Sequence, residues 1–257
     1  MGKDNLGMNV GILTTEVIRE HKLNVIQGIL KQEKFTVNGV YIDCKKPLSI
    51  KEKLLKNIRR GRGFYTVVMM FNKHFKNNDK TYNVKEIFKR DITYFIENLY
   101  SDTTIKIFQD NAHDVLVLID GYGIIKEPIL SVAPNGILSY HHGNIRKYRG
   151  MPPLFWEFFH GEKECGATVQ RLSKKLDAGE IMAETSVKID YAKSFESNKQ
   201  ALYKKSEQLI IDALEKVLND EDGSIPKTFG KVYTLPNFRE WIFFILKSVK
   251  FKLLSGK

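Results

Sequence analysis

Two adjacent histidines, His141 and His142, stand at the end of a hydrophobic segment in the stretch ILSYHHGNIRKYRG. An imidazole can donate or accept a proton near neutral pH, and a carboxylate beside it holds one tautomer and favours the charged ring. The tight turn LDAG supplies such a carboxylate in Asp177. Because neighbouring residues of a strand point to opposite faces, we expect His141 to face a site and His142 to be structural or supporting. A histidine that only satisfies packing is the alternative interpretation.

The loop that follows the histidines carries further polar side chains. Asn144 is a short amide in a glycine turn, and Arg149 ends the loop with a guanidinium that can pair with a carboxylate or a phosphate. Together with Asp177, these side chains favour a catalytic or binding site over a packing role. We expect substrate contacts from four residues of this region, which are His142, Arg146, Tyr148 and Arg149.

The hydrophobic pattern predicts an α/β protein. A strand at Met8–Leu13, a helix at Glu16–Lys31 capped by Thr14 or Thr15, and a strand at Phe35–Ile42 would form a βαβ unit, which implies a parallel sheet. In open α/β sheets, ligands bind outside the carboxyl ends of the strands, and the two histidines fall at such an end. Further strands are expected at 113–120, 136–142, 164–172 and 181–189, and further helices at 126–131, 153–161, 197–219 and 237–257.

The composition predicts a packed core and anionic partners. The 257 residues carry a formal net charge of +11, which favours a phosphorylated or nucleotide-linked molecule, a nucleic acid or an acidic membrane surface. Cys44 and Cys165 have no spacing typical of a disulfide framework or a zinc site, and we expect no metal. The sequence shows neither a secretory signal pattern nor an apolar stretch of membrane-spanning length, so we expect a cytoplasmic protein.

Four motifs in a fixed order carry a family resemblance. They are DVLVLIDGYGII, SYHHGNIRKYRG, PPLFWEFFHGEKECGATVQRL and LDAGEI, and they lie between His113 and Ile181. In order and spacing they resemble the folate-dependent formyltransferases, which include glycinamide ribonucleotide, methionyl-tRNA and nucleotide-sugar N-formyltransferases. The resemblance implies an α/β, Rossmann-like formyltransferase domain with a mostly parallel sheet at residues 1–190, followed by a short helical extension at residues 191–257.

The resemblance also implies 10-formyltetrahydrofolate as the formyl donor and an amine as the acceptor. His141 falls on the family's catalytic histidine and Asp177 on its catalytic aspartate, whereas Ser139 replaces the asparagine that stabilises the oxyanion. We expect Asn144 or His142 to supply the missing hydrogen-bond donor. The folate is expected to lie against Gly121, Tyr122, Gly123, Ile124 and Gln170.

The acceptor is inferred from what lies outside the shared motifs. Methionyl-tRNA enzymes of this family carry a C-terminal β-barrel, whereas the chain after Ile189 is short and mostly helical, so the resemblance disfavours tRNA. Purine enzymes of the family usually carry a glycine-rich phosphate loop after the first strand, which this sequence lacks, so the resemblance also disfavours a purine precursor. We therefore expect an amino sugar linked to a nucleotide or a lipid. Its phosphates would meet the basic residues of the loop, namely Arg146, Lys147 and Arg149.

The tail NFREWIFFILKSVKFKLLSGK mixes aromatic, aliphatic and basic residues in the manner of an amphipathic helix. Two roles stay open for residues 238–257, namely packing on the domain or a second copy in a homodimer, and contact with the anionic inner face of a membrane. Three functional alternatives also stay open. They are a folate- or partner-binding module without turnover, a formyltetrahydrofolate hydrolase, and a nucleic-acid-binding protein, which the scarcity of aromatics among the basic residues disfavours.

Overall fold

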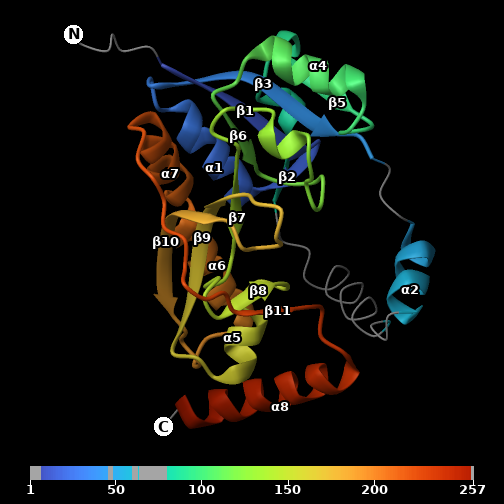
Figure 1. Ribbon diagram of the computed structural model, residues 1–257. Coiled ribbons are helices and arrows are strands. Elements are labelled where there is room, and N and C mark those ends of the chain that lie inside the picture. The colour runs from blue at the N-terminus through green and yellow to red at the C-terminus, as the bar shows by residue number, and fades with distance from the viewer. Residues whose placement is uncertain (1–6, 46–48, 60–62, 64–79, 256–257) are drawn as a thin grey trace.

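A computed structural model describes residues 7–45, 49–59, 63 and 80–255. Within them, seven strands form one sheet in the order β10-β9-β7-β6-β1-β3-β5 (Figure 1). The five strands from β7 to β5 pair in parallel, whereas β9 is antiparallel to β7 and β10 is antiparallel to β9. This mostly parallel α/β sheet confirms the predicted fold class. The strands are β1 (Met8–Thr15), β3 (Phe35–Asp43), β5 (Thr93–Ile96), β6 (Val115–Leu118), β7 (Ile137–His141), β9 (Glu164–Arg171) and β10 (Glu180–Lys188).

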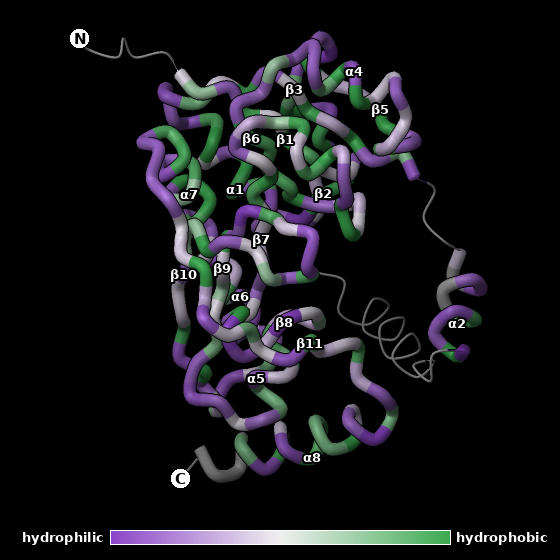
Figure 2. The backbone as a smooth tube through the Cα atoms, in the orientation of Figure 1, coloured by the Kyte–Doolittle hydropathy of each residue, from purple (hydrophilic) through white to green (hydrophobic). Residues whose placement is uncertain are grey.

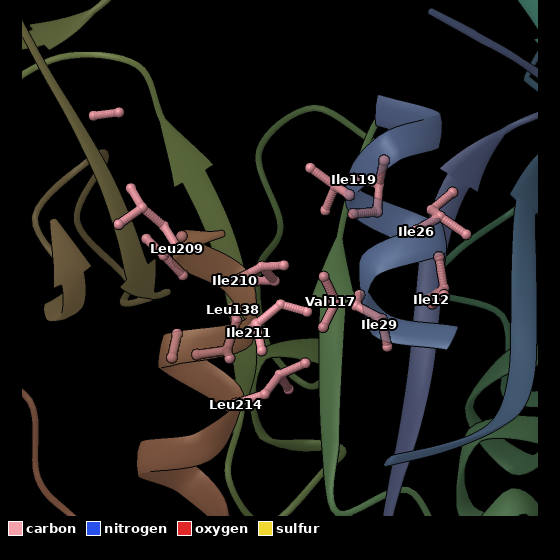
Figure 3. Packing of buried hydrophobic residues seen from close by; sticks show 14 of the residues in the cluster. Ile12, Ile26, Ile29, Val117, Ile119, Leu138, Leu209, Ile210, Ile211 and Leu214 are labelled. Carbon is pink, nitrogen blue, oxygen red and sulfur yellow. The ribbon is translucent and has the colours of Figure 1, made fainter. Parts of the chain in front are cut away.

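Helices cover both faces of this sheet, as a parallel sheet requires. Along β6 and β7, alternate residues enter two different cores: Val117 and Leu138 pack toward α1 and α7, whereas Leu116 and Ile137 lie in a second core with Phe108 of α4. Figure 3 shows the first core, in which Ile26, Ile29, Ile210 and Leu214 gather around Val117 and Leu138. The α-helices are α1 (Glu20–Leu30), α2 (Ile50–Arg59), α4 (Asp102–Asn111), α5 (Phe155–His160), α6 (Phe195–Ser206), α7 (Leu209–Leu218) and α8 (Phe238–Ser255).

The first helix begins later than predicted. β1 continues to Thr15, which pairs with Asp43, and Val17–Arg19 then form a short strand, β2, antiparallel to β4 (Thr81–Asn83). The expected helix at Glu16–Lys31 therefore starts at Glu20, and Thr14 and Thr15 do not cap it. The partner strand lies far along the chain, so local periodicity could not reveal it.

The helix predicted at 197–219 is divided into α6 and α7. The hydroxyl of Tyr140 donates to the carbonyl of Ser206 at 2.9 Å and accepts from the Ile210 N–H at 3.2 Å. A side chain inserted into the helical hydrogen-bond ladder interrupts it. A smaller correction concerns the helix expected at 126–131, where only a 3₁₀ turn at Ile129–Ser131 forms.

The C-terminal segment returns to the domain twice. A short strand, β11 (Lys231–Tyr233), pairs in parallel with β8 (Tyr148–Gly150), and α8 then packs beneath α5 (Figure 1). The helices α6 and α7 pack on the sheet, and the domain boundary at residue 190 stays a prediction. Parts of the basic segment 45–63 and the side chains of residues 252–255 lie outside what the structure describes.

Candidate functional site

His141 ends β7 at the carboxyl edge of the parallel strands, and its side chain is buried. Its Nε2 atom lies 2.9 Å from the carbonyl oxygen of Tyr148, and its Nδ1 atom lies 3.6 Å from Oδ1 of Asp177. A carbonyl only accepts, so Nε2 carries a hydrogen and donates it to Tyr148. Both ring nitrogens therefore face acceptors, and an imidazolium would satisfy both. The separation between Nδ1 and Oδ1 is slightly longer than a hydrogen bond.

Asp177 reaches His141 because two loops are held together. Its backbone is left-handed, with φ +44°, and its Oδ2 atom accepts the N–H of Gly150 at 2.8 Å. Arg149 donates from Nε to the carbonyl of Gly230 at 2.7 Å and from Nη1 to that of Leu176 at 3.1 Å. The Tyr-Arg-Gly motif thus fixes the aspartate of the Leu-Asp-Ala-Gly turn, with the side chain of Arg149 bonded to main chain.

Gly150 has to be a glycine for this arrangement. Its φ is +87°, and a Cβ atom there would lie 2.0 Å from the carbonyl oxygen of Tyr233 on β11. The close pairing of β8 with β11 therefore leaves no room for a side chain, and it aims the Gly150 N–H at Asp177.

Ser139 and Gln170 face each other across β7 and β9, next to the His141–Asp177 pair. Both are buried, and Ser139 lies two residues before His141, on the same face of the strand. Gln170 donates from Nε2 toward Oδ1 of Asp177 at 3.4 Å, while its Oε1 accepts the Gly179 N–H at 2.9 Å. The carboxamide beside the His141–Asp177 pair is thus on β9, opposite the serine.

The structure places Asn144 and His142 away from Ser139. A Cβ atom on Gly166 would touch Asn144, and Gly166 is four residues from Gln170 along β9, roughly 13 Å at strand spacing. The Oδ1 atom of Asn144 accepts the Arg146 N–H at 3.0 Å. His142 points to the opposite face.

His142 is packed among aromatic rings. It stacks on Tyr140 at 5.4 Å between centroids and meets the edge of Tyr203 at 4.7 Å. Burial lowers the pKa of His142 to about 3, with nearby His21 as a smaller cause, so the ring is neutral at physiological pH. Its role as a substrate contact stays a prediction.

The other predicted substrate residues are engaged within the protein. Arg146 forms an ion pair with Glu184, including a bond from Nη2 to Oε1 at 3.1 Å. Tyr148 is buried, and its hydroxyl donates to Oε1 of Glu162 at 2.9 Å. Like Arg149, these residues shape the loop, so a substrate would have to displace their partners to bind them.

The loop at Gly121–Gly123 follows β6 at the same edge. All three residues have positive φ, and the Tyr122 N–H donates to Oδ2 of Asp43 at 2.9 Å. The Tyr122 hydroxyl is buried without a hydrogen-bond partner in the described part of the chain, and burial raises its pKa. Space around Gly123 is open. The loop therefore presents main-chain groups, with its tyrosine turned inward.

Exposed apolar side chains adjoin these motifs. Ile124 is 63% exposed, Met151 53% and Leu176 44%. Met151 follows Gly150 and Leu176 precedes Asp177, so two of them adjoin the Gly150–Asp177 hydrogen bond. Sequence reasoning missed Met151 and Leu176, and the only signal was their place beside motif residues. We call these three residues the apolar rim.

A cavity of about 520 Å³ opens at the start of α1 and the end of α6. His21 and Tyr203 stack in its wall at 4.2 Å, and Tyr203 in turn contacts His142. Three cationic side chains, Arg19, Lys80 and Lys204, line it together with Glu20 and Glu207. The excess of positive charge suits an anionic group.

A second cavity, of about 400 Å³, is lined by Glu157 of α5 and by residues of β9 and β10. Glu157 is only 3% exposed, and its Oε1 has no hydrogen-bond partner among the described residues. Burial raises the pKa of this carboxyl to about 7, with Glu162 as a lesser cause.

The wild type is expected to become less stable as the pH rises, and Glu157→Gln is expected to abolish this dependence. Since the folded-state pKa lies above the ordinary 4.5, the folded protein binds more protons between these values, and the free energy of unfolding falls as the pH rises through them. The free energy of unfolding would be measured with a denaturant at pH 5 and pH 8. Between these pH values, that of the variant should rise by roughly 2–3 kcal/mol relative to that of the wild type. An equal difference at both pH values would contradict this.

Within the described residues, no group of three or more His, Cys, Asp or Glu side chains is placed to hold a metal ion. In the same part of the chain, no helix combines the length and apolarity needed to cross a membrane.

The structure thus has a mostly parallel sheet with the His141–Asp177 pair at its carboxyl edge. A family model described as "Formyl transferase" matches residues 49–214, which is more than half of the chain. The chain therefore belongs to the formyl transferase family, as its motifs predicted.

Two curated relatives each match less than half of the chain. A methionyl-tRNA formyltransferase from Thermotoga neapolitana is 35% identical over 108 residues, which are 42% of this chain and 34% of that protein. The bifunctional polymyxin resistance protein ArnA from Wigglesworthia glossinidia brevipalpis is 31% identical over 124 residues, or 46% of this chain and 19% of that protein. The matched region is thus about a third or less of either relative.

Solved structures share the fold over nearly the whole chain. An N-formyltransferase from Helicobacter canadensis, in complex with folinic acid and dTDP-3-aminofucose, gives a TM-score of 0.59 at 14% identity and covers 95% of this chain and 80% of its own. A glycinamide ribonucleotide transformylase from Symbiobacterium toebii gives 0.60 at 14% identity, covering 90% and 96%.

Proposed function

We propose that this protein transfers a formyl group from 10-formyltetrahydrofolate to the amine of an amino sugar linked to a nucleotide or a lipid. The observation that carries the proposal is the His141–Asp177 pair, 3.6 Å apart at the carboxyl edge of β7. Family membership supports the class of reaction, and the folate and the sugar are inferred beyond it.

The residues around the His141–Asp177 pair can accept the proton that the amine loses and stabilise the negative charge that develops on the formyl oxygen. The attacking amine loses a proton, for which Asp177 is the acceptor, directly or through water, and a proton returns to the folate nitrogen as its bond to the formyl carbon breaks. The formyl oxygen becomes negative, and a donor aimed at it lowers the barrier. Gln170, through its Nε2–H, is the donor next to this point, and His141, as an imidazolium, becomes a second one when an N–H turns from Tyr148 or Asp177 to the formyl oxygen. Ser139 adds a hydroxyl on the same face.

The residues at the edge of β6 fit a folate. The Gly121–Gly123 loop offers main-chain groups, and the apolar rim offers surface that a pterin and its aromatic linker would cover. When bound, the folate supplies an activated formyl carbon. The folinic acid bound to the Helicobacter canadensis relative supports this choice of donor.

Two observations support an amino-sugar acceptor. The relative that holds dTDP-3-aminofucose shares the fold over 95% of this chain. The cavity of about 520 Å³ is lined by three cationic side chains, Arg19, Lys80 and Lys204, and two carboxylates, so it is a candidate for the acceptor's phosphates.

Calorimetric titration with 5-formyltetrahydrofolate, a stable isomer of the donor, tests the folate site. We expect the wild type to bind with a dissociation constant near micromolar, and Ile124→Glu to weaken binding at least about tenfold by placing a charge against the ligand. Ile225→Glu is the matched control, because Ile225 is 74% exposed and outside the site. Absence of binding by the wild type would overturn the assignment of the donor.

A further inference from the structure

The helix α8 has two apolar faces, and only the inner one is covered by the rest of the described chain. On its inner face, Phe244 is 7% exposed and stacks on Phe155 of α5 at 4.6 Å, and Trp241 meets the edge of the same ring at 5.2 Å. Lys247 donates to the carbonyl of Phe159 at 2.8 Å. These contacts hold α8 firmly on the domain and confirm that the tail packs back on it.

The outer face of α8 is exposed and apolar. Hydrophobic and hydrophilic residues alternate along the helix (Figure 2). Large apolar side chains that are exposed recur at helical spacing along it. Scattered exposed apolar residues are ordinary, but a continuous stripe marks an interaction surface. The stripe consists of Ile242 (39% exposed), Phe243 (56%), Ile245 (52%), Leu246 (59%) and Val249 (54%).

We propose that this stripe docks the protein on an anionic membrane surface, with α8 lying in the plane of the interface. The exposed cations Arg239 and Lys250 are near the two ends of the stripe and on the same flank, where lipid headgroups would meet them. The chain carries a net charge of +11, which adds attraction to anionic lipid. Figure 1 shows α8 along one end of the molecule, so its outer face can meet a flat surface without obstruction by the sheet.

Charge favours lipid over a second copy of the chain. Every copy of the chain carries the same net charge of +11, and like charges oppose association, whereas an anionic surface attracts the chain. An anionic bilayer satisfies Arg239, Lys250 and the apolar stripe together.

Vesicle flotation of the full chain tests the docking. We expect the wild type to float with vesicles of phosphatidylcholine and phosphatidylglycerol, to float far less with phosphatidylcholine alone, and to be released by high salt. Ile242→Glu/Leu246→Glu should lower binding at least about tenfold, since two apolar side chains leave the interface. Ile225→Glu should bind like the wild type, and thermal melting should show both variants folded.

Three results would overturn the proposal. The wild type could stay unbound with anionic vesicles, or the double variant could float as well as the wild type. Alternatively, sedimentation could show a wild-type dimer that the double variant abolishes, which would assign the stripe to a second copy. None of these readouts depends on formyl transfer, so the proposed function stands or falls separately.

Discussion

Asp177→Asn is expected to lower the turnover number for formyl transfer by about 10²- to 10⁴-fold, the range for loss of a positioned acid–base group. The amide can keep the shape of the loop and accept the Gly150 N–H, but it carries no charge opposite His141 and takes no proton from the amine. Steady-state kinetics with the folate donor and an amino-sugar acceptor measure the change.

Two comparisons make this result specific. Asp91→Asn removes an exposed carboxylate elsewhere and should leave turnover unchanged. The thermal midpoint of Asp177→Asn should stay near that of the wild type, since asparagine tolerates the left-handed backbone and its amide oxygen can still accept the Gly150 N–H. If a folded Asp177→Asn variant turned over at the wild-type rate, the role of the pair would be wrong.

Gln170→Met is expected to lower the turnover number by about 10²- to 10³-fold, the usual effect of losing one oxyanion donor. Methionine keeps the length of the side chain but removes the Nε2–H next to Asp177. The Michaelis constant for the acceptor should change less than the turnover number, because the donor acts on charge that develops in the transition state.

A second substitution separates this role from a structural one. Gln170 also holds the Gly179 N–H, so its loss could act by loosening the LDAG turn. Ser139→Asn places a carboxamide on the strand opposite, across the same register position. In the Gln170→Met background it should restore part of the turnover if an amide donor is what was lost. No recovery in a folded double variant would indicate that Gln170 only supports the turn.

The closeness of His141 and Asp177 could be expected from short, local motifs, whereas their catalytic role stays a prediction. A buried strand ending in His141 and a tight turn at Asp177 are both visible in sequence, and the Tyr-Arg-Gly segment joins them through main-chain bonds that hardly depend on other side chains. The parallel sheet followed from the strand–helix–strand order at the start of the chain.

Other features depend on contacts between distant segments, which one sequence does not display. The start of α1 is set by β2 pairing with β4, and the division between α6 and α7 is set by Tyr140. The carboxamide beside Ser139 comes from β9, through an antiparallel register that local pattern could not supply. The sequence does not show which face of α8 packs on α5, so the exposed outer face could be identified only from the structure.

Mass spectrometry of a single reaction tests the central claim most directly. The purified protein would be mixed with 10-formyltetrahydrofolate and a panel of nucleotide-linked amino sugars. We predict that one of these sugars gains the mass of a carbonyl group while an equal amount of tetrahydrofolate forms, and that Asp177→Asn shows neither change. Formate released from the folate at the same rate with and without every sugar would instead identify a hydrolase and contradict transfer to an amine.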